Sequence, residues 1–229
     1  MQLNGRIWLY AKRVIVFIIS LFIMALGVSF SVRADLGTTP TSAIPYVTSL
    51  YFPLTMGTLT IIMHVAFILI QILLLRKNFR PINLLQLPLA FIFGYFTDFT
   101  LELTADLHAE TYLIKLVFLA ISIVLVALGV YLLVSAKIMV LAGEGLMMAF
   151  SKVTGAEFGK VKMIGDLSLV AVATAFSLIT MHQVTGIREG TVASALLVGL
   201  LVRVFTRYFV FVDKFLEIRA YERRSEAAA

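Results

Sequence analysis

Uncharged apolar runs of about twenty residues constrain this chain more than any other feature. Residues 14–32 and residues 116–136 contain no Asp, Glu, Lys or Arg, and a helix needs about 20 apolar residues to cross the hydrocarbon core of a bilayer. The chain is 61% hydrophobic and 14% charged, whereas soluble domains are about 45–50% apolar and about 25% charged. The sequence therefore predicts an all-α integral membrane protein and excludes a soluble globular protein.

Runs of this kind predict six transmembrane helices in a single membrane domain formed by residues 1–229. The predicted spans are residues 14–32, 58–75, 83–103, 116–136, 161–181 and 190–212. Residues 213–229 are polar, and we expect them to form a cytoplasmic tail. A cleaved signal peptide is the alternative reading of the first span, but the apolar run exceeds the 7–15 residues typical of such a peptide.

The basic residues predict the orientation in the membrane. With the N-terminus in the cytoplasm, sixteen of the 19 Lys and Arg residues lie on the cytoplasmic side, and only Arg33, Lys115 and Arg188 lie outside. Such a bias is typical of cytoplasmic loops. We therefore expect both termini in the cytoplasm and an even number of spans.

An internal repeat relates the two halves of the chain. The tetrapeptide Ala-Leu-Gly-Val at residues 25–28 recurs 102 residues later, and the same offset carries Gly57 onto Gly159. The repeats would cover residues of about 14–105 and of about 115–212. Each contains three spans, so the second repeat enters the membrane from the opposite side. The sequence thus predicts two inverted three-helix repeats, an architecture typical of secondary transporters.

Each repeat has an apolar connector between its first and second spans. Residues 35–56 contain three prolines, and residues 138–158 contain the run Ala-Gly-Glu-Gly-Leu. Both connectors are too apolar for solvated loops and too short for spans, which indicates a re-entrant or an interfacial short helix. Thr39 followed by Pro40 is typical of a helix start, and such a start presents free N–H groups that suit an anion.

The first half also resembles a known family. The pairs Leu26-Gly27 and Gly57-Thr58, and the run Arg-Ala-Asp-Leu-Gly-Thr-Thr-Pro at residues 33–40, resemble the YczE/YitT-type bacterial integral membrane proteins. The resemblance covers most of residues 20–105 and, more weakly, the second half. It implies a multi-pass protein of the bacterial inner (plasma) membrane and says little about chemistry.

Carboxylates at membrane depth are the first candidates for function, because charges there are costly and are usually retained for a role. Asp166 lies inside the fifth predicted span, and Glu144 lies between two glycines of the inner connector. We expect both to take part in proton coupling. The alternatives are an ion pair between Asp166 and Lys162, four residues earlier, and a solvated turn at Glu144.

A further set of polar and charged residues is predicted to bind the substrate. Arg33, Asp35 and Asp98 lie at the outer ends of spans, where they could form one charge cluster near the proposed helix start, and His64 is a single imidazole within the second span. The alternatives are that Arg33 and Asp98 face lipid headgroups or water, and that His64 only packs. The predicted substrate-binding residues are Arg33, Asp35, Thr38, Thr39, His64, Asp98 and Glu144.

Several kinds of chemistry find no support in the sequence. The chain has no cysteine, and its three histidines are scattered, so we expect no metal site and no cofactor. No nucleotide-binding or hydrolase motif is present, and no basic groove interleaved with aromatic residues favours nucleic acid. We therefore do not expect an enzyme.

The leading hypothesis is a small secondary transporter that moves a small polar or anionic metabolite across the bacterial inner membrane, with proton coupling as the expected driving force. Its partners would be the lipid bilayer, the small-molecule substrate and, in a homo-oligomer, further copies of the chain. Two alternatives remain open: a substrate-binding membrane subunit of a multi-protein importer, and a non-transport accessory or assembly protein.

Overall fold

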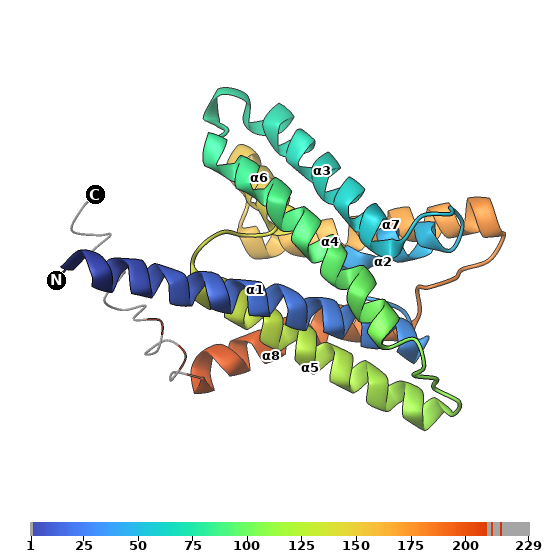
Figure 1. Ribbon diagram of the computed structural model, residues 1–229. Helices are drawn as coiled ribbons and strands as arrows, with labels where there is room; N and C mark the ends of the chain where they lie inside the picture. The colour runs from blue at the N-terminus through green and yellow to red at the C-terminus, as the bar shows by residue number, and fades with distance from the viewer. Residues whose placement is uncertain (1, 210–211, 213–215, 217–229) are drawn as a thin grey trace.

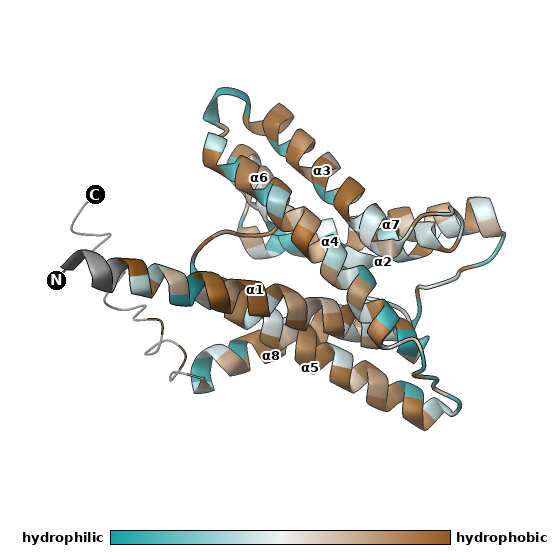
Figure 2. Cartoon of the chain, viewed as in Figure 1, coloured by the Kyte–Doolittle hydropathy of each residue, from teal (hydrophilic) through white to brown (hydrophobic). Residues whose placement is uncertain are grey.

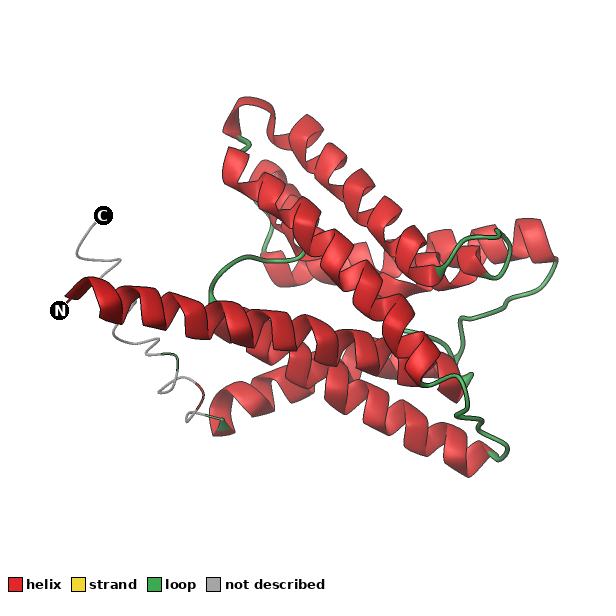
Figure 3. Cartoon of the chain, viewed as in Figure 1, coloured by secondary structure: helices red, strands yellow, loops and turns green. Residues whose placement is uncertain are grey.

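The computed structural model describes residues 2–209, together with 212 and 216, and this part of the chain contains helices and loops but no strand (Figure 3). The helices differ in length, from three residues to 33. In chain order they are α1 (Gln2–Ala34), α2 (Pro40–Ser49), α3 (Met56–Leu75), η1 (Arg76–Asn78), η2 (Pro81–Leu85), α4 (Gln86–Leu103), α5 (Tyr112–Ala136), α6 (Ala142–Thr154), α7 (Phe158–Met181) and α8 (Glu189–Tyr208).

Six of the described helices are long and apolar enough to cross a membrane, which confirms the predicted number of spans: α1, α3, α4, α5, α7 and α8. Hydrophobic residues predominate along these helices (Figure 2). Many of their large apolar side chains are exposed, and Leu113, Leu73 and Ile179 are among the most exposed. An apolar surface of this extent is stable against lipid rather than against water. The chain is therefore a multi-pass membrane protein.

The start of α1 and the end of α8 lie at the same end of the bundle, on the left in Figure 1, while the α4–α5 and α7–α8 links lie at the opposite end. The first and last spans differ from prediction at their ends. Helix α1 extends beyond residues 14–32 at both ends, because it remains helical through its basic start, and α8 ends at Tyr208 rather than at residue 212. Apart from Leu216, the predicted tail (residues 213–229) lies outside the described residues.

Both predicted connector helices form, as α2 and α6. Helix α2 begins at Pro40, whose fixed backbone angle suits a first helical position and whose missing N–H would be unsatisfied there in any case. Helix α6 ends at Thr154, and the cap residue Gly155 that follows adopts a left-handed conformation that glycine accommodates without strain. Neither helix has the length of a span.

Helices α1 and α5 form the centre of the bundle and cross closely (Figure 1). The crossing depends on two glycines: Gly27 of α1 lies against Val126 of α5, and Gly129 of α5 lies against Met24 of α1. A Cβ atom at Gly27 would lie 2.8 Å from the backbone nitrogen of Val126. The absence of side chains thus lets the two backbones touch, as in other closely packed membrane helices.

The remaining helices pack around this centre in a regular order. Helix α4 packs against α1, and α8 packs against α5. Helix α2 packs against α3 and α7, and α6 packs against the same two helices. Helix α4 also packs against α3, where Gly57 and Gly94 allow a close approach.

Candidate functional site

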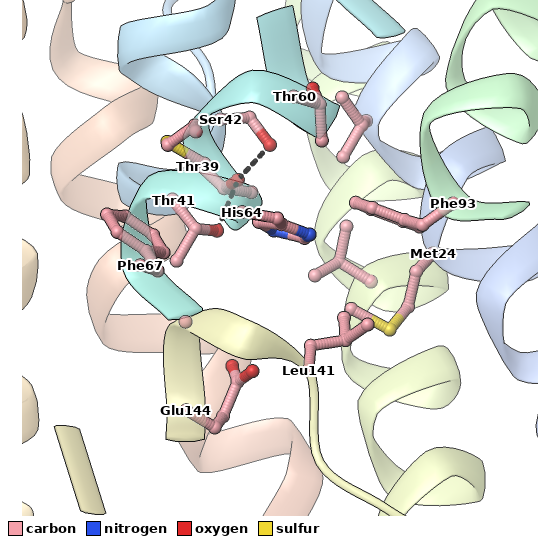
Figure 4. Close-up of a pocket in the computed structure, with 14 residues that line it drawn as sticks. Met24, Thr39, Thr41, Ser42, Thr60, His64, Phe67, Phe93, Leu141 and Glu144 are labelled. Atoms are coloured by element: carbon pink, nitrogen blue, oxygen red, sulfur yellow. Dashed lines mark hydrogen bonds between the residues drawn. The ribbon is translucent and has the colours of Figure 1, made fainter. Parts of the chain in front are cut away.

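A cavity lies where the starts of α2 and α6 approach α1, α3, α4 and α5 (Figure 4). About 40 Å³ of it is open to the centres of water molecules. One water needs about 10–15 Å³ on this measure, so the cavity holds about three waters or a solute of similar size. Its lining comprises Met24, Val28, Thr39, Thr41, Ser42, Thr60, Met63, His64, Phe67, Phe93, Val126, Leu141, Gly143 and Glu144.

Hydroxyl groups from the first turn of α2 form one wall of the cavity. The Thr39 hydroxyl donates to the Ser42 hydroxyl at 3.1 Å and lies 3.5 Å from that of Thr41. Thr39 is the residue that precedes the helix, but its side chain accepts no hydrogen bond from a backbone N–H of the first turn. These N–H groups form the positive end of the helix dipole, and they lie beside the cavity.

The linker between α1 and α2 is held in place by contacts with α8. The carbonyl of Leu36 accepts a hydrogen bond from the N–H of Gly190 at 2.7 Å. The carbonyl of Gly37 accepts one from the Ser31 hydroxyl at 2.9 Å. Gly37 has a φ of +99°, and a Cβ there would collide with the Thr191 hydroxyl. This linker therefore needs glycine both for its conformation and for its contact with α8.

The first turn of α6 brings a carboxylate to the cavity. Glu144 is the third residue of the helix, after Ala142 and Gly143, and its carboxyl group points toward the cavity (Figure 4). Burial raises the pKa of the Glu144 carboxyl, while the nearby Lys162 charge and a backbone hydrogen bond lower it. A proton at this position is therefore easier to retain than on an exposed glutamate.

Two buried glutamines fix the start of α6 against α3 and α4. The Gln71 side-chain nitrogen donates to the side-chain oxygen of Gln86 at 3.0 Å and to the backbone carbonyl of Ala142 at 3.2 Å. Gly145 lies against both glutamines, and a Cβ there would come within 2.6 Å of the Gln86 side-chain nitrogen. These contacts hold Glu144, one residue earlier, at the edge of the cavity.

His64 of α3 lies between the two short helices in the cavity wall (Figure 4). Its side chain is only 5% exposed, and its Nδ1 atom has no hydrogen-bond partner among the described residues. The ring stacks on Phe93 at a centroid distance of 6.0 Å and lies 6.2 Å from the ring of Phe67. A buried ring nitrogen without a partner is costly, and here it borders a cavity in which a ligand or water can reach it.

Three of the predicted site residues therefore meet at one cavity: Thr39, His64 and Glu144. Thr38 is fully buried next to Thr39 but does not line the cavity, and its hydroxyl has no partner among the described residues. Asp166 also lies outside the lining. It pairs with Lys162 at 2.6 Å, which is the ion pair that the sequence offered as the alternative to proton coupling.

The charged residues that were predicted at the outer ends of the spans do not gather into one cluster in the described structure. Arg33 donates to the Leu101 carbonyl at 2.7 Å, which ties α1 to the end of α4. Asp98 accepts from the Gly57 N–H at 2.7 Å and from a nearby threonine, and so caps the start of α3. Asp35 pairs with Lys115 at 2.6 Å.

Sequence reasoning missed the remaining polar lining, Thr41, Ser42 and Thr60, as well as the apolar walls. One signal for Ser42 was present, because the repeat offset of 102 residues connects it with Glu144. Within the described residues, no group of three or more His, Asp or Glu side chains is arranged to hold a metal ion.

Comparison with known proteins identifies relatives but no activity. Over 120 residues the chain is 32% identical to the "Uncharacterized protein YyaS" of Bacillus subtilis (strain 168), a match that covers 52% of this chain and 58% of that protein. No solved structure matches. A family described as a family of unknown function (DUF6198) matches residues 11–207. The chain therefore belongs to the DUF6198 family.

Proposed function

We propose that the chain is a small secondary transporter, built from two inverted repeats, that binds a small polar or anionic metabolite in the cavity between α2 and α6. The single observation that carries the proposal is the make-up of this cavity. Four pairs of its lining residues are 102 residues apart in the sequence: Met24 and Val126, Thr39 and Leu141, Thr41 and Gly143, and Ser42 and Glu144.

Those pairs support a two-fold axis through the cavity. An exchange of the repeats converts α1, α2, α3 and α4 into α5, α6, α7 and α8. Under that exchange the α1–α4 contact becomes the α5–α8 contact, and the α2–α7 contact becomes the α6–α3 contact. The glycine crossing behaves in the same way, because Gly27 against Val126 becomes Gly129 against Met24. Contacts that are exchanged in pairs in this way are the mark of a two-fold relation. The α3–α4 contact has no equally extensive counterpart between α7 and α8 among the described residues.

The two short helices support a transport site rather than a structural cavity. Both begin at the cavity, because the residues that precede them, Thr39 and Leu141, line it. In secondary transporters, helices that are interrupted near the middle of the membrane direct their N-termini at anionic groups of the substrate. A re-entrant placement of α2 and α6 would put the cavity near the midplane, and the polar lining then has a reason to exist in a bilayer.

Proton coupling is assigned in this proposal to Glu144, with Asp166 as a second carboxylate nearby. Glu144 faces the cavity, and the Lys162–Asp166 pair is close enough to influence its pKa. The bias of basic residues supports cytoplasmic termini, and the resemblance to YczE/YitT-type proteins supports a bacterial inner membrane. The resemblance to YczE/YitT-type proteins stays a prediction, because neither the matching family nor the Bacillus subtilis relative is described by that name.

The chain's lack of cysteine allows a direct test that needs no knowledge of the substrate. Ser42→Cys would introduce one thiol into the cavity, and a membrane-impermeant thiol reagent can be applied to right-side-out and to inside-out vesicles. Alternating access predicts labelling from both sides. Ser29→Cys is the matched control, because Ser29 is buried outside the cavity, and it should stay unlabelled. Labelling of Ser42→Cys from one side only would contradict transport and favour a capture subunit.

A further inference from the structure

The two helix starts at the cavity differ in one respect that bears on the ligand. Helix α6 supplies its own carboxylate, since Glu144 lies in its first turn. Helix α2 has no acidic residue in its first turn, and the residue 102 positions before Glu144 is Ser42. A carboxylate near the N-terminus of a helix is stabilised by the dipole and by free N–H groups. One helix start therefore has a carboxyl group from its own chain, and the other has none.

A second observation, independent of the helix start, also indicates a ligand. His64 is more than nine-tenths buried, borders the same cavity, and has an Nδ1 atom without a partner among the described residues. A neutral imidazole offers one donor and one acceptor. An anion at the start of α2 can accept a hydrogen bond from this ring, which removes the cost of the unpaired nitrogen.

The lining limits the charge and size of the ligand. Among the described lining residues there is no Lys or Arg, so a divalent anion such as sulfate or phosphate would be poorly neutralised. Met24, Val28, Phe93 and Val126 form apolar walls, which favour an alkyl group beside the charge. At about 10–15 Å³ for each water-sized group, the cavity volume admits about three to four non-hydrogen atoms.

We propose that the ligand is a short monocarboxylate of the size of formate or acetate, and that it binds together with one proton on Glu144. Its carboxylate would lie at the start of α2, beside His64, in the position that the Glu144 carboxyl group takes at the start of α6. This inference rests on the proposed function, because it names the substrate class of the same cavity.

The charge balance in a small cavity explains why Glu144 should carry a proton when the ligand is bound. Two ionised carboxylates in a cavity of low dielectric repel each other, and one of them then retains a proton. The titratable groups that face Glu144 are His64 from α3 and the Lys162–Asp166 pair from α7. That pair is internally neutralised at 2.6 Å. Burial already raises the pKa of Glu144. The anion and the proton therefore bind together, and the net charge of the cavity does not change.

The test measures binding through the thermal stability of the purified full chain in detergent, since a ligand of the native state raises its midpoint of unfolding. Sodium acetate and sodium formate are titrated at pH 5, 6, 7 and 8 at constant ionic strength, with methylammonium chloride and the bulkier pivalate as comparisons. Uptake of one proton predicts that the acetate Kd rises by up to about tenfold per pH unit above the pKa of Glu144.

Variants then assign the proton. Glu144→Gln should bind acetate with a Kd that does not change with pH, whereas Glu157→Gln, an exposed glutamate just before α7, should behave like the unchanged chain. If Glu144→Gln does not fold, the pH dependence of acetate binding by the unchanged chain still tests the proposal.

Three results would overturn the inference: stabilisation by methylammonium but not by acetate, equal stabilisation by pivalate and acetate, or a Kd for acetate that does not vary with pH. Each of them leaves the transport proposal standing if Ser42→Cys is labelled from both sides. One-sided labelling together with pH-dependent acetate binding would instead refute transport while retaining the ligand.

Discussion

The glycine crossing of α1 and α5 offers the sharpest test of how this bundle is held together. We consider Gly27→Ala, Gly129→Ala and the double variant. At Gly27 the new Cβ would lie 2.7 Å from a Val126 methyl group and 2.8 Å from the Val126 nitrogen. At Gly129 it would lie 2.9 Å from two backbone atoms of α1. Contacts with backbone cannot be relieved by a change of rotamer, so the helices must separate.

The magnitude follows from two opposing effects. Overpacking of a tight interface costs about 1–3 kcal/mol, while alanine gains about 0.5–1 kcal/mol over glycine within a helix. Each single variant should therefore lower the free energy of unfolding by roughly 0.5–2 kcal/mol. The two sites face each other across one crossing, and a separation forced by the first methyl makes room for the second. The double variant should fall short of the sum by at least about 0.5 kcal/mol.

The assay is unfolding of the purified chain in mixed micelles, with the fraction of denaturing detergent as the variable. Gly199→Ala is the matched control, because no atom lies within 4 Å of a Cβ at Gly199, and the same substitution should there be neutral or slightly stabilising. Our reasoning is refuted if Gly27→Ala is as stable as Gly199→Ala, or if the two crossing variants are additive.

Three further outcomes are expected. Asp98→Ala should lower the free energy of unfolding by about 0.5–2 kcal/mol, because the Gly57 N–H at the start of α3 loses its acceptor; Asp106→Ala, in the loop after α4, should not. Gln71→Leu should cost about 1–3 kcal/mol by leaving Gln86 unpaired, and adding Gln86→Leu should restore part of that loss. The raised pKa of Glu144 means that the folded state binds its proton more tightly, so stability should fall as pH rises above 4.5. Glu144→Gln should reduce this pH dependence in thermal unfolding, and a steeper dependence would contradict the assignment.

Much of the fold is predictable from this sequence because length and hydropathy decide which segments cross a bilayer. The uncharged run at residues 116–136 has one stable environment, and the structure has α5 there. The start of the first connector helix was equally predictable, since Thr39-Pro40 is a local helix start. Gly155 is a comparable local signal for the end of α6, although no prediction was based on it. Such signals act within one turn of helix and need no tertiary partner.

The site was less predictable, because the rotation of each helix about its axis depends on its neighbours. Thr60 and His64 share a face of α3 that borders the cavity only because α2 and α6 begin beside it. Arg33 illustrates the converse. The guanidinium donates to a part-buried backbone carbonyl at the end of α4, and no pattern in the sequence indicates that a backbone oxygen rather than a carboxylate would be its partner.

The hydroxyls at the start of α2 also affect how readily this architecture can change its specificity. Thr39, Thr41 and Ser42 interact with one another rather than with the framework in the described structure, while the framework is held by backbone contacts at Gly37 and by the glutamine pair at α6. Substitutions at these three positions should therefore alter the chemistry presented to a solute without removing the contacts that hold the helices together. Relatives of similar architecture can in this way diverge in ligand while their helices stay in register.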